Sequence, residues 1–227
     1  MDLTDPTRAV TPTLDGPVLA VLAQAGKPLT AGEVAARTPR GSEIGVRRSL
    51  ARLVEQGIVR AEEMGRNRVH ELNREHLAAS AAELLSGLRL ELWRRLRSTL
   101  TAWNPKPVYA CVFGSAARGD GDVQSDIDLL LVHLPLPGER DPRRHSGGLN
   151  VAAGLATEFL AVPLTERQLT KWRNQVDQLR GRVQNWTGND LQVLEMSTFQ
   201  WAELKQEQSA LREEINRDAV EIVRGTS

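Results

Sequence analysis

Apolar residues mark three short helices near the start of the chain and two strands that follow them. The expected helices cover residues 17–25, 31–38 and 43–56, and the expected strands cover residues 58–62 and 68–72. The third helix is the most regular of these elements, because its apolar side chains repeat at the spacing that places them on one helical face. A short polar tip joins the two strands, as in a β-hairpin.

Residues that favour helix ends flank these helices. Thr30 and Glu33 have the spacing of a capping box, Ser42 can cap the third helix, and Gly57 ends it. Three helices followed by a hairpin within about 60 residues is the layout of a winged helix-turn-helix. Over residues 14–73 the arrangement resembles the winged-helix domains of bacterial transcription regulators.

The resemblance implies a DNA-binding surface made by arginines. The third helix would enter the major groove, and the hairpin would reach the DNA backbone or the minor groove. The residues so implicated are Arg47, Arg48 and Arg52 on the helix and Arg66 and Arg68 on the hairpin. Two other interpretations stay open: these arginines are solvated surface charges, or the domain is a protein-interaction or dimerisation module.

A long amphipathic helix is expected over residues 74–104. Its leucines recur at helical spacing, at Leu77, Leu84, Leu88, Leu92 and Leu96. This apolar stripe needs a partner, which is either the neighbouring domain or the same helix of a second subunit; a homodimer would suit a two-fold DNA site. The segment Asn104-Pro105-Lys106-Pro107 then breaks the helix and marks a domain boundary.

The remainder of the chain mixes strands with helices. The expected strands are residues 107–113, 125–133, 191–196 and 219–223, and the expected helices are residues 149–160, 165–186 and 201–216, with a surface loop over residues 134–148. The predicted fold class is therefore α+β: an N-terminal winged helix-turn-helix, a long linking helix, and a C-terminal domain with a small mixed sheet flanked by helices. The expected divisions are 1–13 as a flexible lead, 14–73, 74–104 and 105–227.

The composition says more about the cellular compartment of the protein than about its function. Lys plus Arg and Asp plus Glu both number 29 in the 227 residues, so the whole chain gives no reason to expect a polyanionic partner. The single cysteine, Cys111, can form no intrachain disulfide, which fits a reducing compartment. We find neither a span of about 18 apolar residues nor a signal peptide at the start of the chain, so we expect a cytoplasmic protein without membrane contact.

The most informative chemistry is a pair of aspartates that follows a Gly-Ser turn. The first strand of the second half ends at Gly114-Ser115, and the next strand carries Asp126 and Asp128. Side chains two apart on a strand share a face, which puts these carboxylates about 6–7 Å apart. Their repulsion is most simply relieved by Mg²⁺, which binds carboxylate oxygens together with substrate phosphates. The pattern predicts a site of phosphoryl or nucleotidyl transfer.

The segment GSAARGDGDVQSDIDLLL also resembles the nucleotidyltransferases of the DNA polymerase β superfamily, especially the small bacterial members, over residues 112–132. The resemblance implies a C-terminal nucleotidyltransferase fold in which Asp126 and Asp128 hold two Mg²⁺ ions about 3.5–4 Å apart. Gly114 would let the backbone approach a phosphate, Ser115 would donate to it, and Arg118 would pair with the triphosphate or the leaving pyrophosphate.

Two further positions admit more than one assignment. Ser125 is a candidate nucleotide contact, although a role in closing the turn before the strand explains it more simply. The superfamily uses a third carboxylate on a later strand, and Glu195 is favoured here, as catalytic residue and metal ligand, because a charge in an apolar run needs a reason. Asp190 is the other candidate, and if Gln192 holds that position the third ligand is missing.

The sequence thus predicts a Mg²⁺-dependent nucleotidyltransferase that moves a nucleoside monophosphate from an NTP to a hydroxyl acceptor. The attached winged helix favours a regulatory role that involves DNA. The acceptor stays open between a protein side chain, a small molecule and an RNA end. The alternative is a transcriptional regulator whose nucleotidyltransferase-like domain senses nucleotide without catalysis.

Overall fold

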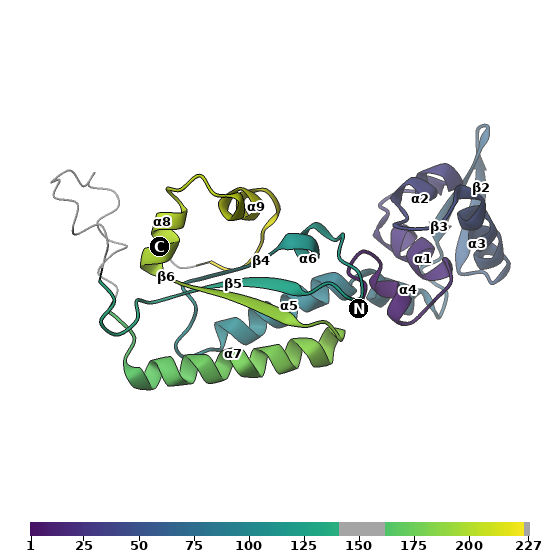
Figure 1. The fold of residues 1–227 in the computed structure, drawn as a ribbon. Helices are drawn as coiled ribbons and strands as arrows, with labels where there is room; N and C mark the ends of the chain where they lie inside the picture. Colours follow the sequence, from purple (N-terminus) through teal and green to yellow (C-terminus); the bar gives the residue numbers. More distant parts are fainter. Residues whose placement is uncertain (141–161, 225–227) are drawn as a thin grey trace. The chain divides into compact units, whose positions relative to one another are not determined.

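The computed structural model describes residues 1–140 and 162–224. The chain divides into two compact units, Met1–Leu92 and Trp93–Ser227 (Figure 1). Within the described ranges, none of the helices combines the length and the apolar character needed to cross a bilayer.

Unit 1 contains the three helices and the hairpin that the sequence predicts. Its elements are η1 (Pro6–Ala9), α1 (Asp15–Gln24), β1 (Leu29–Thr30), α2 (Ala31–Arg37), α3 (Glu43–Glu55), β2 (Val59–Met64), β3 (Asn67–Leu72) and α4 (Ala79–Ser86). The strands form an antiparallel sheet in the order β1-β3-β2. The expected caps are also present, since Thr30 and Glu33 form a capping box and the Ser42 hydroxyl accepts from the Gly45 amide.

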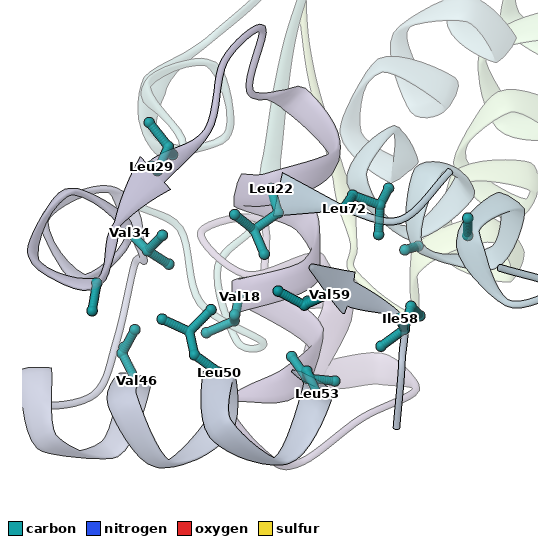
Figure 2. Close-up of a cluster of buried hydrophobic side chains, with 13 residues drawn as sticks. Val18, Leu22, Leu29, Val34, Val46, Leu50, Leu53, Ile58, Val59 and Leu72 are labelled. Carbon is teal, nitrogen blue, oxygen red and sulfur yellow. The ribbon is translucent and has the colours of Figure 1, made fainter. Parts of the chain in front are cut away.

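The core of unit 1 joins α1, α2 and α3 to the hairpin (Figure 2). Val18 and Leu22 on α1 and Val46 and Leu50 on α3 belong to this one cluster, and all four are at most 2% exposed. Burial of each such side chain contributes roughly 1.5–3 kcal/mol, so the apolar stripe of α3 accounts for the packing of this helix.

Two segments of this part of the chain differ from the expected picture. The segment 1–13, expected as a flexible lead, contains the 3-10 helix η1, which packs against α1, and its Leu3 is 2% exposed. The single helix over 74–104 is instead two helices, α4 and α5 (Leu88–Thr101), which are separated at Gly87. The leucines therefore do not form one stripe: Leu77 is 97% exposed, whereas Leu96 is fully buried.

Unit 2 is built on a mixed sheet of the order β6-β5-β4-β7. The elements that follow α5 are β4 (Tyr109–Phe113), α6 (Gly114–Arg118), β5 (Ile127–His133), α7 (Glu166–Thr187), β6 (Leu191–Ser197), α8 (Thr198–Leu204), α9 (Ala210–Asp218) and β7 (Val220–Val223). β5 runs parallel to β6 and antiparallel to β4, and β7 pairs antiparallel with β4. The small mixed sheet predicted for this half of the chain is confirmed.

Helices cover both faces of this sheet. Figure 1 shows α7 on one side and α8 and α9 on the other. On the α8 and α9 side, Leu130 and Val132 of β5 pack with Leu204 and Ile215. The edge strand β7 is held from α5 by Arg97, whose guanidinium donates to the backbone oxygens of Glu221 and Ile222.

Two other elements differ from the sequence prediction or escape it. The helix expected over 201–216 is interrupted, since α8 ends at Leu204 and Ser209 caps the separate helix α9. The helix expected over 149–160 lies outside the described residues, as does much of the loop expected over 134–148.

Candidate active site

The site begins where β4 ends and the chain turns into α6. Gly114 has φ +69°, and a Cβ at this position would lie only 2.5 Å from Oδ2 of Asp128. Phe113 pairs with Asp128 in the β4–β5 register, which brings the turn directly beside that carboxylate. Both the left-handed backbone and the close approach therefore require glycine. The Ser115 hydroxyl lies close to Gly121 in the next turn: a Cβ added to Gly121 would be 3.0 Å from Ser115 Oγ.

The two aspartates lie at the start of β5. Asp126 is exposed and immediately precedes the strand, whereas Asp128 is half-buried within it. The pKa of Asp128 is raised, first by burial and then by the negative charges of Asp126 and Glu214, while Arg118 opposes the rise. The protein thus gathers negative charge at this point and leaves it only partly compensated.

A tight turn positions the pair, and Ser125 belongs to that turn. The Ser125 hydroxyl donates to the Asp122 carboxylate and accepts from the Asp122 amide, both at 2.9 Å. The hydrogen bond from Ser125 lowers the pKa of Asp122. Asn189, only 3% exposed, donates from Nδ2 to the backbone oxygens of Ser125 at 2.9 Å and Asp122 at 3.5 Å. The sequence interpretation missed Asn189, which fixes the turn next to Asp126.

Arg118 is held by one nearby carboxylate and by two carboxylates of α9. Its guanidinium lies 2.9 Å from Asp120, 3.1 Å from Glu214 and 3.3 Å from Asp218. Hydrogen bonds to Asp120, Asp218 and Glu214, in that order of importance, raise its pKa. No local pattern indicates the two partners on α9, because they are 96 and 100 residues away along the chain.

The structure does not bring Glu195 to the aspartates. In the parallel β5–β6 pairing, Gln192 is opposite Asp128, and Gln192 Nε2 lies 3.3 Å from Asp126 Oδ2. Glu195 is three residues further on, so it points to the other face of the sheet, where its carboxylate accepts a hydrogen bond from the indole of Trp172. The prediction that Glu195 completes the site is therefore wrong.

Asp190 does not complete the site either. Its carboxylate lies 3.3 Å from Gln184 Nε2 of α7, and its carbonyl accepts from the Ile127 amide. Across residues 1–140 and 162–224, no three His, Cys, Asp or Glu side chains come close enough together to hold a metal ion.

The five arginines proposed for DNA contact fall into two groups. Arg47 pairs with Glu43 along α3, and Arg52 pairs with Asp15 of α1. Burial alone would raise the pKa of Asp15, but hydrogen bonds from Arg52, Ser49 and Thr13 lower it to about 2.

Arg52 thus ties α3 to α1. The remaining arginines, Arg48, Arg66 and Arg68, are exposed and have no ion pair with any described residue.

Comparisons with known proteins agree with the chemistry of unit 2. Residues 93–184 match the family model of the nucleotidyltransferase domain. The match begins at Trp93, the first residue of unit 2, and includes the Gly114 turn and both aspartates. This part of the chain is therefore similar to a nucleotidyltransferase domain, and the similarity suggests transfer of a nucleoside monophosphate.

No curated protein matches the chain. Among solved structures, human N-acetylserotonin methyltransferase in complex with SAM is similar at 20% identity over 39% of this chain and 28% of that chain. The TM-score is 0.26, and at this level the similarity supports no conclusion about fold or function.

Proposed function

We propose that unit 2 transfers a nucleoside monophosphate from an NTP to a hydroxyl acceptor, with release of pyrophosphate. The observation that carries the proposal is the approach of the Gly114 turn to Asp128, beside a second aspartate that precedes the same strand. A glycine turn leaves room for phosphate oxygens, and paired carboxylates next to it suit a divalent cation shared with those oxygens.

The residues present fit Mg²⁺ bound jointly by Asp126, Asp128 and the substrate phosphates. The pKa of Asp128 is raised by burial and by neighbouring negative charge, which is the electrostatic state that a bound cation would relieve. Bound there, Mg²⁺ would supply charge stabilisation at the phosphates and lower the pKa of the acceptor hydroxyl.

The protein side chains would orient the reactants. Ser115 would donate to a phosphate oxygen, and Arg118 would pair with the β- and γ-phosphates. The acceptor oxygen would attack the α-phosphorus while the bond to the bridging oxygen of pyrophosphate breaks, and the hydroxyl proton would pass to solvent. Gln192 cannot take that proton, because an amide is not a base at neutral pH.

We also propose that unit 1 is a winged helix-turn-helix that binds DNA, so that transferase activity serves regulation. The support is the order of α1, α2, α3 and the hairpin, together with the exposed cations Arg48, Arg66 and Arg68. Arg52 is assigned a packing role instead, because Asp15 holds it. A homodimer stays a prediction that sedimentation equilibrium would test.

Transfer is tested with the full chain, Mg²⁺ and each α-labelled NTP in turn, with pyrophosphate release as the readout. We expect release that Asp126→Asn and Asp128→Asn each reduce by at least about 100-fold, because each removes a carboxylate ligand. Binding of Mn²⁺ in the presence of a nonhydrolysable NTP, followed by electron paramagnetic resonance, should fall in parallel. Asp177→Asn, an exposed carboxylate on α7, is the matched control and should change neither quantity.

A second candidate is a regulator that binds nucleotide without turnover. Two observations favour it: Gln192 faces Asp128 where a third carboxylate was expected, and Arg118 is occupied by Glu214 and Asp218. Nucleotide-dependent DNA binding without pyrophosphate release would support the sensor. Absence of any Mn²⁺–NTP binding at the aspartate pair would eliminate both candidates.

A further inference from the structure

Unit 1 contains a basic groove between α3, the start of α2 and the β2–β3 hairpin. Its volume is about 710 Å³, and its polar lining consists of Thr30, Arg47, Arg66, Asn67, Arg68 and His70. Every charged or titratable side chain in this lining is a cation or can become one. A groove with three guanidinium groups and no carboxylate is suited to a phosphate, which guanidinium groups bind with paired hydrogen bonds.

The arginines of the groove differ in how readily they can engage a ligand. Arg66 and Arg68 are exposed and form no ion pair with the described residues. Arg47 is bonded to Glu43 of the same helix, and both side chains are more than half exposed. An exposed ion pair along a helix contributes only about 0.3–0.5 kcal/mol, so a phosphate can displace Glu43 from Arg47.

His70 forms part of the groove wall and is 7% exposed. Its Nδ1 is buried and has no hydrogen-bond partner in the described structure. Burial lowers the pKa of His70 most, and the positive charges of Arg68 and Arg47 lower it further.

Among the described residues, Arg68 and Arg47 are the charged groups that act on the ring, and both line the same groove. The neighbouring strands β1 and β2 place Leu29 and Ala61 opposite His70, and neither carries charge.

We propose that this groove binds a backbone phosphate of DNA and that His70 takes up a proton as the phosphate binds. The inference rests on the DNA-binding role proposed for unit 1 and extends it to a specific groove and to a dependence on pH. A phosphate between Arg47 and Arg68 removes the repulsion that these arginines exert on a protonated imidazole. The pKa of His70 therefore rises in the complex, and binding draws a proton from solvent.

The sign of the effect follows from linkage between protonation and binding. When the pKa of a group is higher in the complex than in the free protein, protonation of that group favours binding. The gain in affinity is complete at pH values below the pKa of the free protein, and it is lost at pH values above the pKa of the complex. DNA as the source of the phosphate is favoured because exposed positive charge is not confined to the groove: Arg48, which follows Arg47 on α3, is also exposed and lies outside the groove lining.

The test measures anisotropy of fluorescein-labelled duplex DNA with the full chain between pH 5.5 and 8.0 at fixed ionic strength. Affinity should fall by about 3- to 10-fold over this range, and His70→Asn should flatten the profile. Arg68→Ala should weaken binding at every pH and reduce the slope of log K against log salt by about 1. His76→Asn and Arg60→Ala, which alter unit 1 outside the groove, should leave the profile and the slope unchanged.

A spectroscopic measurement reports on the His70 ring itself. Addition of duplex DNA should raise the pKa of the His70 imidazole in NMR titrations of ring-labelled protein. If the chain binds DNA but His70→Asn keeps the wild-type pH profile, the groove assignment is overturned. If inorganic phosphate raises the His70 pKa and DNA does not, a small phosphate ligand replaces DNA. If the chain binds no duplex even at low salt, the DNA role of unit 1 fails, whereas pyrophosphate release by unit 2 is unaffected.

Discussion

Substitution of Gly114 by alanine tests the geometry of the proposed site most directly. Gly114 has φ +69°, which costs an L-residue roughly 1–2 kcal/mol. In addition, the new Cβ would lie 2.5 Å from Asp128 Oδ2, whereas ordinary contacts begin at 3.4 Å. The carboxylate must therefore move by about 0.9 Å, and an off-rotamer side chain costs about 0.5–1.5 kcal/mol. We expect Gly114→Ala to lower the free energy of unfolding of unit 2 by about 1.5–3.5 kcal/mol.

Gly138→Ala is the matched control. Gly138 has φ +79° and no atom within 4 Å of the added Cβ, so it shares the backbone cost without the contact. All five tryptophans (Trp93, Trp103, Trp172, Trp186 and Trp201) belong to unit 2, so tryptophan fluorescence during urea unfolding reports on this unit alone. Gly114→Ala should be less stable than Gly138→Ala by about 0.5–1.5 kcal/mol, the cost of moving Asp128.

The displacement of Asp128 also has a functional consequence. Metal ligands tolerate deviations of about 0.2 Å, so a shift several times larger should weaken Mn²⁺ binding in the presence of a nonhydrolysable NTP by at least about 10-fold. Gly138→Ala should bind Mn²⁺ like the wild type. Equal stability and equal Mn²⁺ affinity for the two variants would refute the close approach of the turn to Asp128.

Three further predictions concern other contacts. Glu195→Gln should leave Mn²⁺–NTP binding unchanged, whereas Glu195→Ala should destabilise unit 2 by about 1–2 kcal/mol in urea unfolding, because the Trp172 indole loses its acceptor. Asn189→Ala should lower the stability of unit 2 by about 1–2 kcal/mol and weaken Mn²⁺ binding, since the turn before β5 loses its support. Wild-type unit 1 should lose stability as pH falls from about 4 toward 2, because the pKa of Asp15 is about 2 only in the folded state. Asp15→Asn should abolish this loss, which hydrogen exchange measures.

Each of these has an outcome that contradicts it. A loss of Mn²⁺ binding in Glu195→Gln would restore that residue to the site. For Asn189, the control Asn185→Ala lies on an exposed position of α7, and an equal effect of both variants would remove the positioning role. An unchanged acid profile in Asp15→Asn would show that the pairing with Arg52 adds nothing to folding.

The sequence predicted those parts of the molecule in which local signals agree. Helix α3 has a capping serine, an apolar stripe and a terminating glycine, and the structure places it at Glu43–Glu55, one residue shorter than expected. The Gly114 turn and the Asp126–Asp128 pair were readable because both depend on neighbours within one strand–turn–strand segment. The prediction of one helix over 74–104 was wrong because periodicity alone cannot detect a break such as that at Gly87.

The sequence alone could not tell which residue of β6 faces Asp126 and Asp128. Strand parity predicts that Glu195 and Asp190 face opposite sides, yet both carboxylates accept hydrogen bonds from α7, because Asp190 precedes β6 and does not follow the alternation of the strand. Parity also could not say which side of β6 faces the aspartates. The β5–β6 register decides this, and it depends on long-range pairing. The charge of Glu195 in an apolar run did have a reason: it accepts a hydrogen bond from Trp172, which is 1% exposed. Because Trp172 lies on a separate helix, the spacing of residues around Glu195 could not reveal this contact.

Arg97 affects whether the edge of this sheet can pair with a strand of another chain. β7 is an edge strand, and edge strands offer free backbone groups that can recruit a strand from another chain. The register between β7 and β4 shifts at this point, and Arg97 binds the backbone oxygens of two consecutive residues there, Glu221 and Ile222. An irregular register and a guanidinium on two backbone acceptors make this edge a poorer template for a strand of another chain, which counters edge-to-edge aggregation.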